Sequence, residues 1–217
     1  MNNPGVPSFD LRLYVVTDRA WLNGGKLEEQ VEQAIEGGAT LVQLREKSLA
    51  TGEFIAAAER VKRVTDHYGV PLIINDRLDV MLAVDAAGLH IGQDDMPART
   101  ARRLLGPDRI LGVSVADCDQ ALEAEGDGAD YLGAGAVFPT GTKLDATEVD
   151  YGQLQRLTAT VRVPVVAIGG INEHNALELC GSGIRGIAVV SAIFGRPDIR
   201  AAARAMRELA ERIASSG

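Results

Sequence analysis

The chain has 217 residues, of which 46% are hydrophobic and 24% charged, and its formal net charge is −8. This composition is typical of a globular chain and excludes a disordered one, while the acidic balance argues against nucleic acid as the main partner. No apolar run approaches the roughly 18 residues that a membrane span requires, and the first ten residues lack the basic and apolar regions of a secretory signal. The two cysteines are too few for a disulfide framework. We therefore expect a cytoplasmic, single-domain protein that acts on something small.

Short apolar runs alternate with segments of helical spacing along the chain. Leu27, Val31 and Ile35 recur every four residues and predict one helix, and Ile55, Ala58 and their neighbours predict the next. The expected strands, in chain order, are Leu13–Thr17, Leu41–Leu44, Pro71–Ile74, Gly88–Ile91, Ile110–Ser114, Tyr131–Gly133, Val163–Ile168 and Ile187–Val190. Strands that alternate with helices predict right-handed parallel connections.

This pattern makes eight strand–helix units, which is the number that closes a (β/α)8 barrel. An open doubly wound sheet is the competing fold, but it normally has five or six strands and a glycine-rich first turn. The first turn here reads Thr17–Ala20 and contains no glycine. We therefore predict an α/β protein with one TIM barrel over residues 11–217, preceded by a loose arm at residues 1–10.

Polar residues follow almost every expected strand. In a barrel the active site lies at the carboxyl ends of the strands, so these side chains are expected to meet at one mouth. Arg45, Lys47 and Lys143 are cations suited to phosphate oxygens, whereas Asp76 and Asp95 are carboxylates spaced for a divalent cation such as Mg²⁺. The same acids could instead only pair with neighbouring arginines. Further along, the glycines at 169–170 and the serine at 191 follow strands seven and eight, where barrels commonly bind phosphate, although glycines there could simply turn the chain.

Nucleophilic catalysis is not indicated by the sequence. No Gly-x-Ser-x-Gly elbow is present, and we expect Ser114 to have no nearby histidine to activate it. His90 lies inside an expected strand, where we interpret it as a satisfied interior imidazole.

Seven motifs together resemble those of thiamine-phosphate synthases. They are LYVVTD at 13–18, QLREK at 43–47, IIND at 73–76, GLHIGQDD at 88–95, GVS at 112–114, VFPTGTK at 137–143 and AIGGI at 167–171. Each motif is weakly specific, but the ordered set covers nearly the whole chain. The resemblance implies a TIM-barrel transferase of thiamine biosynthesis. Such an enzyme joins 4-amino-2-methyl-5-hydroxymethylpyrimidine diphosphate to a thiazole phosphate and releases pyrophosphate.

The resemblance also implies which residues form the site. Asp76 and Asp95 would hold Mg²⁺, and Lys47, Arg45, Ser114 and Lys143 would act on the departing diphosphate. The pyrimidine diphosphate site would comprise Gln43, Arg45, Glu46, Lys47, Asn75, Ser114 and Lys143, and the thiazole phosphate site Thr140, Gly141, Thr142, Gly170, Val190 and Ser191.

Two alternatives remain open from the sequence. A related thiazole tautomerase uses a histidine in the turn after strand six, where this chain has Ala136. A non-catalytic barrel that binds phosphorylated ligands would be expected to have lost Lys143 or a metal aspartate. We also expect the segment Thr142–Asp150 to be able to close over the site, and a homo-oligomer is compatible with the sequence.

Overall fold

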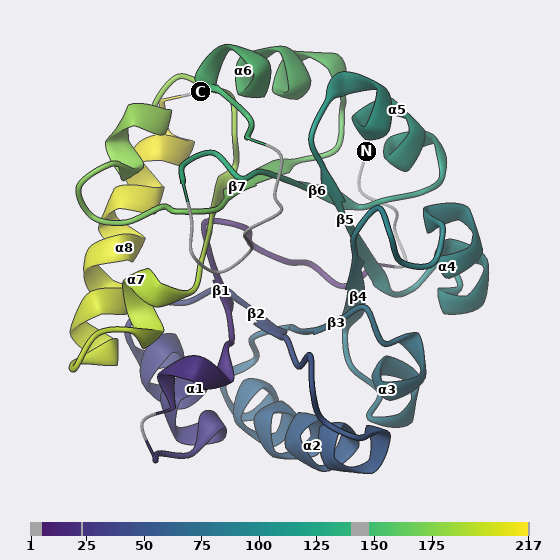
Figure 1. The fold of residues 1–217 in the computed structure, drawn as a ribbon, viewed down its shortest axis with the longest axis vertical. Helices are drawn as coiled ribbons and strands as arrows, with labels where there is room; N and C mark the ends of the chain where they lie inside the picture. The colour runs from purple at the N-terminus through teal and green to yellow at the C-terminus, as the bar shows by residue number, and fades with distance from the viewer. Residues whose placement is uncertain (1–5, 23, 140–147, 217) are drawn as a thin grey trace.

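Eight parallel strands close into a barrel in chain order in the computed structural model, which describes residues 6–22, 24–139 and 148–216 (Figure 1). The strands are β1 (Leu13–Val16), β2 (Leu41–Leu44), β3 (Leu72–Asn75), β4 (Gly88–Ile91), β5 (Ile110–Val115), β6 (Tyr131–Ala134), β7 (Val165–Ile168) and β8 (Gly186–Val189). The prediction of a single (β/α)8 barrel is confirmed, and the open doubly wound sheet is excluded.

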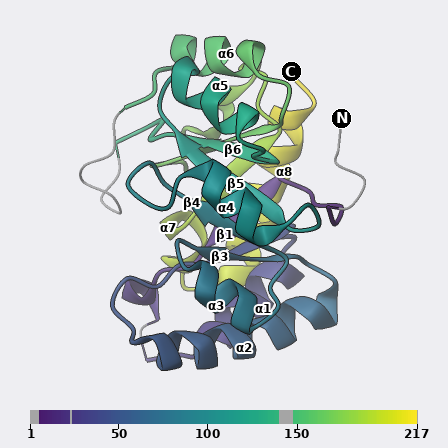
Figure 2. The ribbon, with the colours of Figure 1, turned by 90° about the vertical axis from the view of Figure 1, so that its right-hand side faces the viewer.

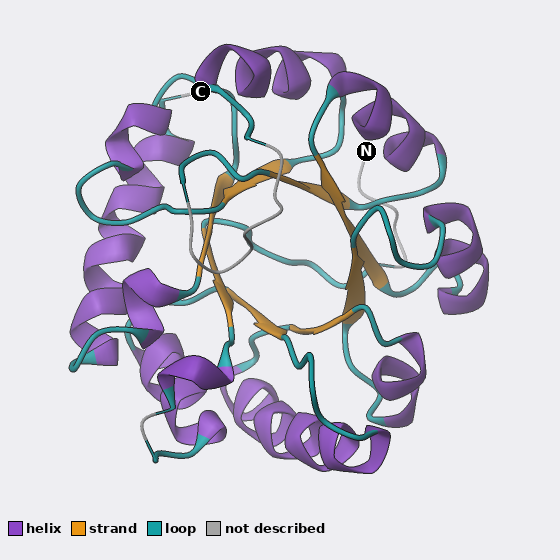
Figure 3. Cartoon of the chain, viewed as in Figure 1, coloured by secondary structure: helices purple, strands orange, loops and turns teal. Residues whose placement is uncertain are grey.

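Helices form a ring outside the strands, as Figure 3 shows in purple around orange. They are α1 (Leu27–Glu36), α2 (Thr51–Tyr68), α3 (Leu78–Ala83), α4 (Ala98–Leu105), α5 (Cys118–Gly126), α6 (Tyr151–Thr160), α7 (Ser191–Phe194) and α8 (Ile199–Ala214), with 3-10 turns η1 (Arg19–Trp21) and η2 (Ala176–Leu179). Among the described residues, no helix is both long and apolar enough to cross a membrane.

The connection between β7 and β8 departs from the regular pattern. It is described throughout and contains only the 3-10 turn η2 instead of the expected α-helix. Gly181 and Gly183 follow η2 with φ of 77° and 82°, so the chain turns sharply into β8 before a longer helix can form. The helix α8, which comes after β8, packs against η2.

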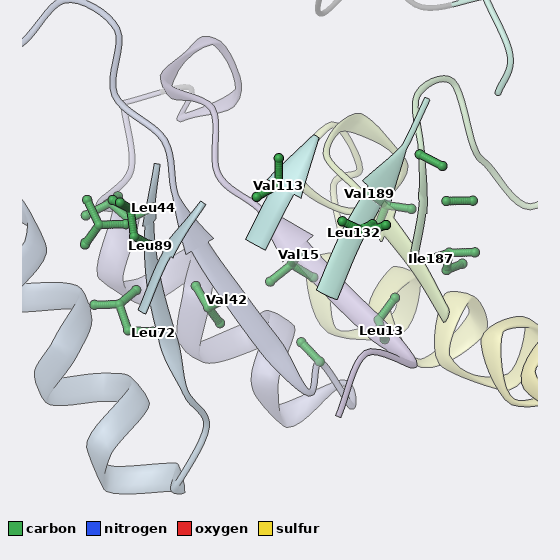
Figure 4. Packing of buried hydrophobic residues seen from close by; sticks show 14 of the residues in the cluster. Leu13, Val15, Val42, Leu44, Leu72, Leu89, Val113, Leu132, Ile187 and Val189 are labelled. Atoms are coloured by element: carbon green, nitrogen blue, oxygen red, sulfur yellow. The ribbon is translucent and has the colours of Figure 1, made fainter. Parts of the chain in front are cut away.

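Two apolar layers hold the barrel together. Side chains alternate along each strand, so Val15 points outward to the helices while Tyr14 and Val16 point inward. Figure 4 shows outward residues such as Leu44 and Leu89 in the layer between strands and helices. Because both faces of each strand are covered, the strands read as continuous apolar runs, which is why the sequence located them.

The described start of the chain lies at the end of the barrel opposite to α7 (Figure 2). There Val6 and Phe9 pack against the interior layer, and the Phe9 ring centroid lies 5.8 Å from that of Tyr131. Residues 1–5 of the expected arm lie outside the described residues, so the domain boundary at residue 11 stays a prediction.

Two leucines test how much the layer outside the strands contributes to stability. Leu89 on β4 is fully buried, whereas Leu104 on α4 is 49% exposed. We expect Leu89→Ala to lower the free energy of unfolding by about 2–5 kcal/mol, because it removes buried methyl groups and leaves a cavity. The matched variant Leu104→Ala should stay within about 0.5 kcal/mol of the wild type. Urea unfolding measures both, and equal losses would contradict the layer assignment.

Candidate active site

A cavity of about 370 Å³ opens at the carboxyl ends of the strands. Strand pairing sets its walls: β3 ends at Asn75, which pairs with His90 on β4, and the next amide, Asp76 N, donates to the carbonyl oxygen of His90 at 2.8 Å. Of the predicted site residues that the structure describes, all but Glu46 line this cavity: Gln43, Arg45, Lys47, Asn75, Asp76, Asp95, Ser114, Gly170, Val190 and Ser191.

Two carboxylates and an ammonium group meet on one wall of the cavity. Lys47 Nζ donates to Asp76 Oδ2 at 2.7 Å, and the amide of Gly92 donates to Asp95 Oδ2 at 2.7 Å. Burial raises the pKa of Asp95, and the neighbouring Asp76 carboxylate raises it further, against the opposing effects of the Gly92 amide and Lys47. Two neighbouring carboxylates provide hard oxygen ligands for a cation. Asp76 itself has φ of 61°, a left-handed conformation that is uncommon outside glycine.

Arg45 and Glu46 diverge although they are neighbours in the sequence. Arg45 lines the cavity, its amide donates to Thr17 Oγ1 at 3.1 Å and its guanidinium lies 3.7 Å from Asp18. The Glu46 carboxylate turns away and accepts Arg19 Nε at 2.8 Å on both oxygens. Burial raises the pKa of Glu46, although Arg19 acts in the opposite direction.

The opposite wall of the cavity is built largely from backbone. Gly169 and Gly170 follow β7 with φ of 101° and 66°. A Cβ on Gly170 would lie 2.5 Å from the carbonyl oxygen of Pro139, so the chain requires glycine there. Val190 and Ser191, which follow β8, complete this wall.

Four predicted site residues lie outside the described residues: Thr140, Gly141, Thr142 and Lys143. The same holds for residues 142–147 of the segment that we expected to close over the site. Their assignments therefore stay predictions.

The inference that Ser114 has no nearby histidine is wrong. His90 Nε2 lies 2.9 Å from Ser114 Oγ, and His90 Nδ1 lies 2.9 Å from the hydroxyl of Tyr131. The residues are 24 positions apart in the chain, but β4 pairs with β5 and brings them together. The prediction of a satisfied interior imidazole is confirmed, since His90 is 7% exposed.

Sequence reasoning also missed the interior tyrosines. The Tyr14 hydroxyl lies 2.7 Å from that of Tyr131, and Gln43 Nε2 donates to Tyr14 at 2.6 Å. The alternation of side chains along β1 and β6 would have placed both rings inside the barrel. No sequence signal gives their contact, because β1 and β6 are not neighbours in the sheet.

Asn75, which lines the cavity, carries a side-chain nitrogen that has no partner among the described residues. Asn75 Nδ2 is buried and makes no hydrogen bond within the part of the chain that the structure describes. An unsatisfied buried donor is costly, so a ligand oxygen or ring nitrogen in the cavity would remove that cost.

The fold and cavity define a (β/α)8-barrel protein whose mouth combines cations, paired carboxylates and a glycine-built wall, an arrangement suited to phosphorylated ligands. The family model described as thiamine monophosphate synthase matches residues 13–193. A thiamine-phosphate synthase of Clostridium beijerinckii is 50% identical over 93% of this chain and 96% of its own, and one of Ruminiclostridium cellulolyticum is 52% identical over 92% and 95%. A solved thiamine phosphate pyrophosphorylase of Pyrococcus furiosus superposes with a TM-score of 0.86 at 44% identity, covering 94% of this chain and 96% of that one.

The chain belongs to the thiamine monophosphate synthase family. It is accordingly a transferase of thiamine biosynthesis, and the two alternatives left open by the sequence are disfavoured. At the position where the tautomerase has its histidine, Ala136 lines the cavity and carries no group that could transfer a proton.

Two glycines test the backbone wall. Gly170 and Gly69 have nearly the same φ, 66° and 67°, but nothing lies within 4 Å of a Cβ built on Gly69. Gly69→Ala should cost about 1–2 kcal/mol of unfolding free energy for its left-handed backbone alone. Gly170→Ala should cost at least about 1 kcal/mol more, because its methyl group would overlap backbone oxygens. Urea unfolding of both variants compares them, and equal costs would show that the wall is not tightly packed.

Proposed function

We propose that the pyrimidine diphosphate and the thiazole phosphate bind side by side in this cavity, with the diphosphate against Arg45, Lys47 and a magnesium ion. The observation that carries this assignment is the meeting of Lys47 with Asp76 and Asp95 on one wall, away from the glycine wall of Gly170. Two separate anionic groups thus have two chemically different places to bind.

Magnesium fits the residues of the first wall. Mg²⁺ is usually held by one or two carboxylates, with substrate phosphates and waters completing its shell. Asp76 and Asp95 supply two such carboxylates, which lie close enough for Asp76 to raise the pKa of Asp95. We therefore assign these two aspartates as the metal ligands. When bound, the ion would neutralise charge on the diphosphate.

The pyrimidine has its own polar contacts in this assignment. Asn75, whose Nδ2 is unpartnered among the described residues, and Gln43 both line the cavity that would hold the ring and its diphosphate. Glu46 supports the site indirectly, since its carboxylate holds Arg19 and does not line the cavity.

The chemical step requires charge neutralisation on a leaving group more than it requires a strong base. The C–O bond to the diphosphate breaks with its electron pair moving to oxygen, and the electron-rich aminopyrimidine stabilises the methylene cation that remains. The thiazole nitrogen then forms the new C–N bond, and pyrophosphate departs. Arg45 and Lys47 hold the developing charge on the leaving oxygens, as Lys143 is predicted to do. Ser114 donates a hydrogen bond there and forms no covalent bond.

The thiazole phosphate is assigned to the glycine wall. Gly170, Val190 and Ser191 line the cavity on that side, and the lack of a side chain at Gly170 lets the backbone approach an anion closely. Thr140, Gly141 and Thr142 are predicted to complete this site.

We further propose that the enzyme works in the cytoplasm, where free cysteines such as its two stay reduced. Its partners in this proposal are the two small phosphorylated substrates. The enzyme would act as a monomer or as a homo-oligomer.

Incubation with both substrates and Mg²⁺ tests the proposed reaction directly. We expect equal amounts of thiamine phosphate and pyrophosphate, and EDTA should abolish both products. A folded protein that forms neither product in the presence of Mg²⁺ would contradict the assignment.

Two aspartates with left-handed backbones provide a matched test of the metal site. Asp76 has φ of 61° and Asp85 has φ of 54°, and asparagine tolerates this conformation, so both substitutions to asparagine should fold. Asp85 pairs with Arg109 away from the cavity. We expect Asp76→Asn to lower kcat about 100-fold and to raise the Mg²⁺ concentration needed for half-maximal rate. Asp85→Asn should match the wild type. An Asp76→Asn enzyme with full Mg²⁺-dependent coupling would refute the metal assignment.

A further inference from the structure

Five polar side chains from five strands are linked by a continuous series of hydrogen bonds across the barrel interior. It runs from Gln43 Nε2 to the Tyr14 hydroxyl at 2.6 Å, then to the Tyr131 hydroxyl at 2.7 Å, to His90 Nδ1 at 2.9 Å, and from His90 Nε2 to Ser114 Oγ at 2.9 Å. Gln43, Asn75 and Ser114 line the cavity, whereas the two tyrosines are 0–1% exposed beneath it. The two tyrosine hydroxyls are therefore shielded from bulk solvent and need hydrogen-bond partners inside the protein.

The available donors and acceptors determine in which direction each hydrogen bond of this series runs. Gln43 donates to the Tyr14 oxygen, so the hydroxyl proton of Tyr14 has Tyr131 as its acceptor. Tyr131 then donates its own proton to His90 Nδ1. A neutral imidazole that accepts at Nδ1 carries its proton on Nε2, and this N–H donates to Ser114. The reverse direction leaves the Tyr14 proton without an acceptor among the described residues, at a fully buried site.

Close packing holds the hydrogen bond between Tyr131 and His90 in place. A Cβ on Gly112 would lie 2.1 Å from Tyr131 Cζ and 2.5 Å from His90 Nδ1, so only glycine leaves room for the contact. Phe9 packs on the other side of the Tyr131 ring. Burial also raises the pKa of both Tyr14 and Tyr131, which keeps both phenols protonated as donors.

We propose that Tyr131 is a positioning residue that acts through His90: its hydroxyl fixes the imidazole with the proton on Nε2, and this orients Ser114 as a hydrogen-bond donor into the cavity. Because Ser114 Oγ then accepts from His90, its own proton is directed toward an oxygen of the bound diphosphate. This last step rests on the proposed function, whereas the state of His90 does not. Tyr131 contacts no substrate in this arrangement and would leave binding largely unchanged.

Nitrogen-15 spectra of the histidine rings test the tautomer directly. The chain has only three histidines, so His67→Gln and His174→Gln identify the signals of His90. We expect the wild type to show a protonated Nε2 and an unprotonated Nδ1 at His90. Tyr131→Phe keeps the ring but removes the hydroxyl, and His90 should then show a mixture of tautomers. Tyr14→Phe removes only the upstream donor, and the Nε2–H form should persist.

Kinetics separate positioning from a general structural role. Tyr131→Phe should lower kcat about tenfold, the loss expected for one ordered hydrogen bond to a charged group, while KM for both substrates stays within about twofold. The control Tyr68→Phe, which removes an exposed hydroxyl near Glu32 and Glu36, should leave kcat and KM unchanged.

Three outcomes would overturn parts of the proposal in distinguishable ways. If His90 of the wild type carries its proton on Nδ1, the proposed direction of the hydrogen bonds is wrong. This result needs no variant to fold. A Tyr131→Phe enzyme with an unchanged tautomer and unchanged kcat overturns the positioning role. A wild type with the Nε2–H form but no coupling activity supports the tautomer and contradicts the proposed function instead.

Discussion

The register of the parallel strands decides which side chains share the mouth of this barrel. Asn75 on β3 pairs with His90 on β4, which pairs with Gly112 on β5, which in turn pairs with Tyr131 on β6. A shift of one residue in any pair would turn these polar side chains outward into the apolar layer between strands and helices. Closure in chain order therefore fixes both the cavity wall and the hydrogen-bonded chain beneath it.

The negative net charge of the protein does not describe the local charge at the mouth of the barrel. The chain carries a net charge of −8, yet Arg45 and Lys47 place two cations at the mouth. Asp76 lies close enough to Asp95 to raise the pKa of the Asp95 carboxyl, and Lys47 offsets only part of this effect. A divalent cation together with a diphosphate would balance the charges of this group, so a negative net charge is compatible with binding a small anion.

The sequence predicted the strands well because burial on both faces leaves a continuous apolar run. The expected bounds Leu41–Leu44 and Gly88–Ile91 match β2 and β4. The other strands differ by one or two residues at one end, except β3 and β8, which are each shifted by one residue at both ends. The residues after the strands could be placed at the mouth for the same reason, since parallel strands all end on one side. The helix expected between β7 and β8 did not form, because closely spaced glycines turn the chain early.

Contacts that depend on strand register could not be read from the sequence. Ser114 and His90 look unrelated 24 residues apart, and Tyr14 reaches Tyr131 across 117 residues. Glu46, between two residues that line the cavity, bonds Arg19 instead, because the run of residues after β2 turns successive side chains in different directions. The sequence motifs thus predicted which residues lie at the mouth of the barrel. The hydrogen-bond partner of each polar group there depends on how the strands pair in the folded structure.

The most direct test of the central claim, two chemically distinct anion sites on opposite walls of one cavity, is a crystal structure with Mg²⁺, pyrophosphate and thiamine phosphate. We predict pyrophosphate beside Arg45 and Lys47, with the metal between it and the carboxylates of Asp76 and Asp95. The phosphate of thiamine phosphate should lie against Gly170 and Ser191. Both anions bound on the same wall, or a metal bound away from the two aspartates, would contradict this arrangement.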